Sequence, residues 1–360
     1  MKSKIEKILY DNLFVNILLT IFLTHIFYKI SFINRIQGEF LLIEQIKSGS
    51  IDSTQFYVES PLFTLIGVLF DINNFDIYLL FVYLITLIFL FLITINLKFL
   101  ENYSTLFLLT GWVVTVSWFM GHVDILSVLL ILLITKITIS KNNQELKLLF
   151  FYTLLTINHN AIAFVCFFVL LILVEKEQRI RFIIFSFLGQ VFGNLLISIY
   201  LNTINFSGRG RLRFVFNDNV ILDSVNFVSE NIFVVVWSGF MGMLILQLVL
   251  SITTDWKSNR KFLISLLISL FFTCIALDTS RIFSLSVIPI SIYTIDRLKN
   301  SKFIRENLSY LYILSFTILF IVGPRYVHGS YLKISPNNEI ESFYNFIPRI
   351  INSIMSGIWN

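Results

Sequence analysis

Long apolar runs separated by short basic segments constrain this chain more than any other feature. The 360 residues are 56% hydrophobic and only 14% charged, with a mean hydropathy of +0.82. An ordinary soluble domain is about one quarter charged. A soluble globule of this length has too little interior to bury so much apolar surface, and a disordered chain or a disulfide-rich scaffold would have a different composition. The sequence therefore predicts a polytopic integral membrane protein of the all-α class.

A membrane span needs about 20 apolar residues, and fewer where neighbouring helices cover it. On this rule we expect about eleven spans, which together form a helical bundle with amphipathic helices on its outer face. They are 11–30, 76–97, 104–120, 124–138, 147–158, 160–174, 182–200, 232–253, 262–277, 281–295 and 308–323. No pair of Gly- or Pro-broken spans stands out in matching positions, which speaks against an inverted-repeat transporter.

The positions of Lys and Arg predict the orientation of the bundle. The net charge is +5, and most of the basic residues lie in short segments on one side. This pattern indicates cytoplasmic loops rather than nucleic-acid binding. We expect the N-terminus inside and the C-terminus outside, in a bacterial inner membrane.

The outer side of the predicted bundle carries the three long connecting segments. These are the first outer loop 31–75, the outer loop 201–231 and the C-terminal tail 324–360. The apolar stretch 61–71 is too short to span and predicts a half-helix at the outer interface. The chain thus divides into a bundle over 1–323 and a tail over 324–360, with a 208–230 loop that we expect to be mobile.

Polar and ionisable residues gather at the outer ends of the expected spans. They are Glu39, Glu59, His122, Asp124, His159, Asn160, Arg209, Arg211, Arg213, Asp278 and Arg281. Ionisable groups at membrane depth are costly and usually face a cavity or one another. Their joint occurrence on one side predicts a polar cleft there.

Each of these residues also has a plainer structural interpretation. Asp124 can stabilise a helix N-terminus, and Asp278 with Arg281 can form a local salt bridge. Glu39 can be a solvated loop carboxylate, and His159 can satisfy backbone groups in a turn. The arginines of the 201–231 loop can contact anionic lipid headgroups.

A cleft with carboxylates, imidazoles and guanidinium groups suits a lipid-phosphate substrate. Arginine binds phosphate oxygens with two parallel hydrogen bonds, and a carboxylate can take a proton from an attacking sugar hydroxyl. Cations then stabilise the phosphate as it leaves. Walker, HExxH and GxSxG motifs do not occur in the sequence, which removes support for nucleotide-driven transport, metalloproteases and serine hydrolases.

Short motifs of the chain resemble the GT-C superfamily of membrane glycosyltransferases, which use polyprenyl-phosphate-linked sugars. The resemblance rests on segments 38–43, 47–49 and 56–62 of the first outer loop, on GHVDIL at 121–126 and on DTSR at 278–281. It covers mainly residues 1–200. Two departures are the glutamate at position 39, where the family often has aspartate, and the lack of a large C-terminal soluble domain.

The resemblance implies roles for individual residues. Glu39 would be the catalytic base, and Asp124 would be a supporting or metal-contacting acid. The remaining polar residues of the outer side would bind substrate or its phosphate: Glu59, His122, His159, Asn160, Arg209, Arg211, Arg213, Asp278 and Arg281. No cofactor and no defined metal site is implied, although a divalent cation fits the chemistry.

The implied activity moves a sugar or glycan from a polyprenyl-(di)phosphate-linked donor to an acceptor hydroxyl at the outer face of the membrane. The acceptor would be a glycan or a lipid-linked glycan. O-antigen and capsule polymerases share this pattern, and the arginine-bearing segment 207–213 fits them well. A lipid-linked oligosaccharide flippase or transporter is the alternative from another class, followed by a non-catalytic assembly subunit.

Overall fold

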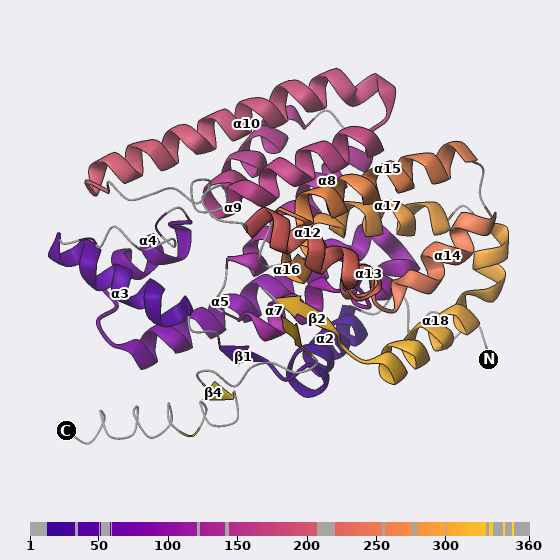
Figure 1. The fold of residues 1–360 in the computed structure, drawn as a ribbon, viewed down its shortest axis with the longest axis horizontal. Helices are drawn as coiled ribbons and strands as arrows, with labels where there is room; N and C mark the ends of the chain where they lie inside the picture. The colour runs from indigo at the N-terminus through magenta and orange to yellow at the C-terminus, as the bar shows by residue number, and fades with distance from the viewer. Residues whose placement is uncertain are drawn as a thin grey trace.

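The computed structural model describes most of the chain as a bundle of helices with four very short strands (Figure 1). The described residues are 13–32, 35–49, 51, 58, 60–120, 123–140, 144–206, 220–253, 256–275, 279–299, 301–328, 331–333, 341–342 and 348. The all-α prediction is confirmed for this part of the chain.

The helices of the first half run from the first expected span to the long helix α10. They are α2 (Leu13–Ile21), η1 (Phe22–Phe27), α3 (Arg35–Ser48), α4 (Leu62–Leu69), α5 (Phe75–Asn96), η3 (Leu97–Tyr103), α6 (Ser104–Phe107), α7 (Trp112–Trp118), α8 (Asp124–Ile139), α9 (Glu145–Leu173) and α10 (Lys176–Thr203). Among them, α4 is the short helix that the sequence predicts over 61–71.

The second half contains shorter helices. They are α12 (Val220–Glu230), α13 (Ile232–Phe240), α14 (Met243–Thr253), α15 (Trp256–Thr273), α16 (Thr279–Ser286), α17 (Ile288–Leu298) and α18 (Lys302–Val322). Helix α12 occupies residues 220–230 of the segment 208–230 that we expected to be a mobile loop. The expected mobility of this segment stays a prediction, and residues 208–219 lie outside the described part.

Two antiparallel strand pairs involve the C-terminal tail. Strand β1 (Ser31–Phe32) pairs with β4 (Glu341–Ser342), and β2 (Tyr326–His328) pairs with β3 (Tyr331–Lys333). Strand β2 also packs against α13 and α16. The beginning of the tail therefore lies on the helical bundle.

Three helical segments in the described part of the chain are long and apolar enough to cross a membrane. They are Phe75–Glu101, Glu145–Leu173 and Lys176–Thr203, and α13 with α14 makes a fourth if this pair, bent by 98°, is one span. Two shorter apolar helices cover Val15–Phe27 and Glu306–Val322. These helices support a membrane protein, whereas the expected number of eleven spans stays a prediction.

Helix α9 folds back on itself at His159, whose backbone leaves the helical region with φ −156° and ψ 81°. Glu145 at its start and Val174 just past its end line the same cavity. A straight helix of 29 residues would hold its ends about 42 Å apart. The reversal divides α9 into a first leg, 145–158, and a second leg, 160–173. The ring of Phe182 in α10 lies 6.0 Å from the ring of Tyr152 in the first leg and 5.8 Å from that of Phe167 in the second. The reversal falls where the sequence places the boundary between spans 147–158 and 160–174.

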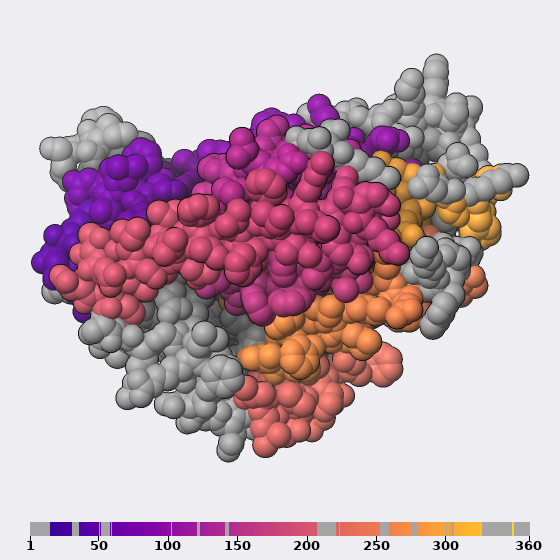
Figure 2. Space-filling view, turned by 90° about the horizontal axis from the view of Figure 1, so that it is seen from above, coloured from indigo at the N-terminus to yellow at the C-terminus, as the bar shows by residue number. Residues whose placement is uncertain are grey.

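Helix α10 packs closely on the first leg of α9 and leaves its other faces exposed. A Cβ on Gly189 would lie 2.7 Å from the carbonyl oxygen of Leu149, and one on Gly193 would lie 2.5 Å from the Cβ of Thr156. Small residues allow this close approach of two helices. The helix extends along the outside of the face in Figure 2, where apolar side chains are exposed, among them Ile180, Ile184, Phe187, Leu195 and Ile199. Such a surface suits contact with lipid.

Two helix breaks bond to each other in the interior. The amide of Gly111, between α6 and α7, donates to the Gly239 carbonyl at 2.8 Å, and the amide of Gly242 donates to the Leu109 carbonyl at 3.1 Å. At the second break, Met241 has a positive φ of 42°. Backbone groups freed by a break must be satisfied inside the protein, because lipid offers them no partner. Each break therefore supplies the hydrogen bonds that the other lacks.

The sequence did not predict this contact between two helix breaks. The expected spans 104–120 and 232–253 are both broken helices, and both breaks contain a glycine. The sequence predicts one span in each of these two segments, and the structure divides each into two helices. An apolar run gives the same hydropathy whether its helix is straight or broken, so the break is visible only in the packed structure.

We predict that Gly111→Ala prevents stable folding, whereas Gly67→Ala costs about 1 kcal/mol. A Cβ at Gly111 would overlap the backbone carbonyl oxygen of Ser238, whereas one at Gly67 would meet the movable end of the Ile43 side chain. Overpacking in a core usually costs about 1–3 kcal/mol, and more where the backbone cannot shift. Thermal unfolding of the purified variants in detergent measures the difference. Equal midpoints would contradict the close crossing of the two breaks.

Candidate functional site

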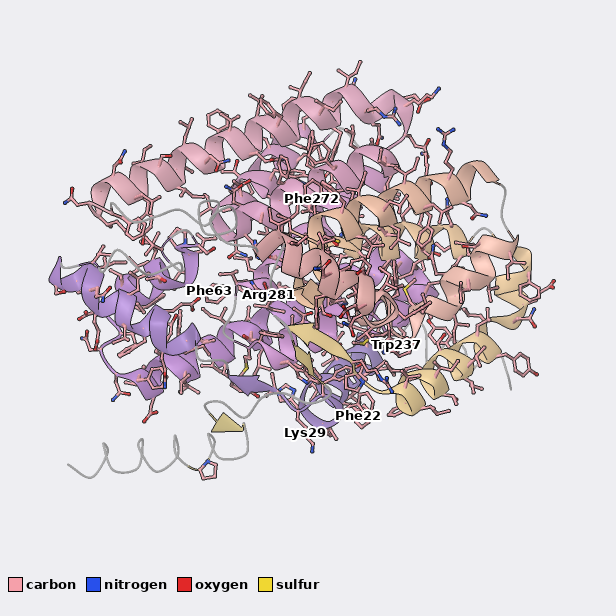
Figure 3. All side chains as sticks on the ribbon, viewed as in Figure 1. Phe22, Lys29, Phe63, Trp237, Phe272 and Arg281 are labelled. Carbon is pink, nitrogen blue, oxygen red and sulfur yellow. The ribbon has the colours of Figure 1, made fainter. Side chains whose placement is uncertain are left out.

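Three residues that are far apart in the sequence meet in one buried cluster, here called the Asp124 cluster: Asp124, His159 and Arg281. The Nε of Arg281 donates to Oδ2 of Asp124 at 2.7 Å, and its Nη2 lies 3.4 Å from Nε2 of His159. Their exposed fractions are 0%, 3% and 6%. Figure 3 shows Arg281 near the middle of the molecule, surrounded by helices.

Each member of the Asp124 cluster lies where a helix begins or reverses. Asp124 is the first residue of α8, His159 is the reversal point of α9, and Arg281 lies in the first turn of α16. Of the carboxylates described, Asp124 is the ion-pair partner of Arg281. The interpretation of Asp124 as a helix cap alone is therefore incomplete, because its carboxylate neutralises a buried guanidinium.

Asn158 ties two of these elements together. Its Nδ2 donates to the carbonyl oxygen of Val123 at 2.7 Å and to the hydroxyl of Ser127 at 2.9 Å. Val123 directly precedes Asp124, and Asn158 directly precedes His159. One buried amide thus holds the backbone beside both residues, so the Asp124 carboxylate and the His159 ring keep a constant relation.

Helix α16, which carries Arg281, is held from two sides. The hydroxyls of Thr115 in α7 and Ser284 in α16 lie 2.5 Å apart. On the other side, a Cβ on Gly239 of α13 would lie 2.5 Å from the ring of Phe283, so the two helices touch closely. These contacts determine how α16 is rotated about its axis and therefore where the guanidinium of Arg281 points.

Glu39 lies on α3 and is also buried, with 1% of its surface exposed. The hydroxyl of Tyr78 in α5 donates to Oε2 of Glu39 at 3.2 Å. Its neighbours on α3, Ile36 and Phe40, belong to an apolar cluster that also contains Tyr78 and Met120. The alternative that Glu39 is a solvated loop carboxylate is wrong, because the side chain is enclosed between α3 and α5.

A surface ion pair fixes the far end of α3. The Nζ of Lys47 lies 2.6 Å from Oδ1 of Asp71 and donates to Oδ1 of Asn73 at 2.7 Å. The hydrogen bond and the charge of Lys47 lower the pKa of the Asp71 carboxyl. Because that pKa is depressed, the pair helps to hold α3 at neutral pH and loses its contribution as acid protonates Asp71.

The structure separates the predicted site residues into three groups. Asp124, His159 and Arg281 are brought together, and Glu39 contacts Tyr78 instead. Asn160 is exposed, and its Nδ2 donates to Oδ1 of Asn194 in α10, so it lies outside the Asp124 cluster and its substrate-binding role stays a prediction. Asn160 is the first residue of the second leg of α9, and its side chain faces α10 rather than the Asp124 cluster. The others lie outside the described residues: Glu59, His122, Arg209, Arg211, Arg213 and Asp278.

Sequence reasoning missed the residues that support the site. Asn158, Ser127 and Tyr78 are polar residues inside apolar runs, which is a usable signal for a buried hydrogen bond. Thr115 and Ser284 give no such signal, because hydroxyl side chains in a helix usually bond to their own backbone.

Within the described residues, no group of three or more His, Cys, Asp or Glu side chains is placed to hold a metal ion. The Asp124 cluster contains one carboxylate and one imidazole, and its third member is a cation. Its electrostatics favour an anionic ligand at the guanidinium over a metal bound within the cluster.

No protein-family model, curated protein or solved structure matches this chain. The geometry of the buried polar residues and the apolar helices around them are the features that point to a function.

We predict strong thermodynamic coupling between Asp124 and Arg281. Arg281→Met removes the cation that pairs with the buried Asp124 carboxylate and should cost about 3–5 kcal/mol, as should Asp124→Leu. The double variant removes both charges and should recover most of this loss. Unfolding of all four proteins in detergent gives the coupling energy.

The pair Lys261 and Glu175 is a matched control. It is more exposed, with Nζ 3.6 Å from Oε1, and its removal should cost about 1 kcal/mol or less. Additive losses for the Asp124 and Arg281 variants would contradict the buried ion pair.

Proposed function

We propose that this protein is an integral membrane glycosyltransferase that uses a polyprenyl-phosphate-linked sugar donor. The observation that carries the proposal is the Asp124 cluster, a buried guanidinium held by a carboxylate and an imidazole among apolar helices. The proposal includes a bundle of about eleven membrane spans, with the N-terminus on the inner and the C-terminus on the outer side of the membrane. Sugar transfer takes place at the outer face.

Arg281 is the proposed phosphate-binding residue. Asp124 holds the Nε edge of the guanidinium, so the planar group is oriented before a substrate arrives. A guanidinium pre-oriented in an enclosed site stabilises the charge that develops on a leaving phosphate without reorganising first. His159, whose Nε2 lies 3.4 Å from Nη2, adds a group that can carry a proton next to that phosphate.

Glu39 is the proposed base. Its carboxylate is shielded from water and oriented by the Tyr78 hydroxyl. Met120 packs in the apolar cluster that surrounds Tyr78, and Asp124 follows it by four residues. The segment that leads into α8 therefore connects the surroundings of Glu39 with the Asp124 cluster, and a donor bound between them would meet both.

The lengths of the helices support a substrate that is itself a lipid. His159 divides the 29 residues of α9 into two legs of 14 residues each. Each leg is about 21 Å long, which is less than the roughly 30 Å of a bilayer's hydrocarbon core. The Asp124 cluster lies at one end of these legs, and Lys147, Lys176 and Arg181 lie at the other. If the basic end is at the membrane surface, the cluster is sunk below the opposite surface, where a lipid-linked phosphate can reach it.

Transport of a lipid-linked glycan is the second candidate, and the two interlocked helix breaks favour it. Broken helices at membrane depth often surround transported substrates. Here the breaks satisfy each other's backbone groups through the bonds at Gly111 and Gly242. A transporter would need these bonds to open during its cycle, whereas an enzyme can keep them closed.

We predict that Glu39→Gln lowers glycosyl transfer by at least about 100-fold, the usual contribution of a general base. The assay measures transfer from the polyprenyl-linked sugars of the native membrane in detergent-solubilised extracts. Detergent removes the two compartments, so only an enzyme, and not a transporter, gives turnover there. Arg281→Lys keeps the charge but loses the two-pronged geometry, and should raise KM for the donor.

Glu44→Gln is the matched control, because Glu44 is an exposed carboxylate on the same helix α3. This variant should retain wild-type activity. Full turnover of Glu39→Gln at equal folded protein would refute the proposed role of the base. Loss of glycan export in cells, without any turnover in detergent, would favour the transporter.

A further inference from the structure

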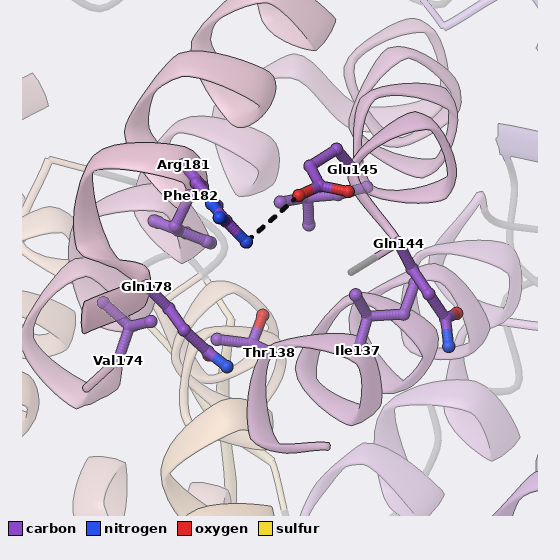
Figure 4. Close-up of a pocket in the computed structure, with 9 residues that line it drawn as sticks. Ile137, Thr138, Gln144, Glu145, Val174, Gln178, Arg181 and Phe182 are labelled. Carbon is purple, nitrogen blue, oxygen red and sulfur yellow. Dashed lines mark ion pairs between the residues drawn. The ribbon is translucent and has the colours of Figure 1, made fainter. Parts of the chain in front are cut away.

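A small cavity lies at the opposite end of α8 and α9 from the Asp124 cluster. It has a volume of about 50 Å³ and is bounded by the end of α8, the start of α9 and the first turns of α10. Figure 4 shows polar side chains from these three helices around it, with Leu148 and Phe182 among the apolar lining. The proposed transferase chemistry makes no use of this cavity.

The cavity is lined by one negative and one positive side chain. Glu145 at the start of α9 and Arg181 of α10 approach to 3.5 Å, and their side chains are 28% and 59% exposed. The carboxylate therefore lies deeper than the guanidinium. A lone anion bound here would meet Glu145, and a lone cation would meet Arg181. A ligand with both charges matches both residues.

The polar side chains next to this pair favour one kind of cationic group over another. Gln144, Gln178 and Thr138 add amide and hydroxyl oxygens to the lining. A primary ammonium donates up to three hydrogen bonds to such oxygens, whereas a trimethylammonium donates none. The cavity of about 50 Å³ is small, since about 10–15 Å³ on the same measure holds one water molecule, so a compact ammonium fits better than a trimethylated one.

Exposed apolar side chains follow the cavity along α10, beyond the charged residues at the start of that helix. Along α10, Ile180, Ile184 and Phe187 are exposed by 71%, 48% and 58%, on the same helix as Gln178 and Arg181. A ligand that places a zwitterionic head in the cavity can therefore extend hydrocarbon chains along α10. This combination of a charged pair and an adjoining apolar face describes a phospholipid.

We propose that this cavity binds the headgroup of a phospholipid with a primary ammonium, a phosphatidylethanolamine. The ammonium lies at Glu145, the phosphate lies outward at Arg181, and the acyl chains follow α10. The site is independent of the proposed transferase chemistry, because it is at the other end of the helices.

The test uses delipidated protein in detergent and three lipids with identical acyl chains: phosphatidylethanolamine, phosphatidylcholine and phosphatidylglycerol. Native mass spectrometry measures retention of each lipid. The wild-type protein should retain phosphatidylethanolamine about tenfold better than the other two, the effect expected of one charge-assisted hydrogen bond. Glu145→Gln should reverse the preference toward phosphatidylglycerol, because Arg181 then remains as the only charge of the pair.

Two further variants make the result specific. Gln178→Leu keeps the ion pair and removes one polar group of the lining, and should weaken retention of phosphatidylethanolamine without a switch to phosphatidylglycerol. Glu175→Gln removes a carboxylate at the same end of the bundle that pairs with Lys261 outside the cavity lining, and should change nothing. Equal retention of the three lipids by the wild type, or the same preference in Glu145→Gln as in the wild type, would overturn the proposal.

Discussion

The structure of this protein depends on one buried ion pair, between Arg281 and Asp124. Among apolar helices neither charge is tolerated without the other, so α8 and α16 must meet although 157 positions separate these residues. His159 joins them because α9 reverses at that residue. The hydrogen bonds of Asn158 and the contact between Thr115 and Ser284 then support a geometry that the ion pair requires.

Interrupted helices form an important part of the interior of the bundle. The reversal at His159 turns one 29-residue segment into two short legs, and the breaks at Gly111 and Met241 satisfy each other's backbone. Short legs keep the Asp124 cluster within about 21 Å of the opposite end of the bundle. This short distance is the basis of the proposal that a lipid-linked substrate reaches the cluster from within the bilayer.

The two ends of α8 and α9 differ in chemistry. At one end the buried guanidinium of Arg281 is paired with Asp124 and suits an anionic phosphate. At the other end Glu145 and Arg181 form a half-exposed pair beside the apolar surface of α10, and this suits a zwitterionic headgroup. Both proposals follow from one principle: a charge placed at membrane depth or at its edge is stable only where protein or ligand supplies its opposite.

Much of this could be predicted from the sequence, and the division has a physical basis. Hydropathy is a local property, so the sequence by itself determined the all-α class, the apolar helices, the short helix α4 and the helix boundary at His159. It also indicated Asp124, His159 and Arg281, because ionisable residues in apolar surroundings need partners. Only the tertiary structure decided which partner each one has, that Asn160 faces α10, and that Gly111 must be a glycine. Those facts depend on backbones and side chains that meet across 34 to 157 positions of the chain, and local sequence patterns do not encode such contacts.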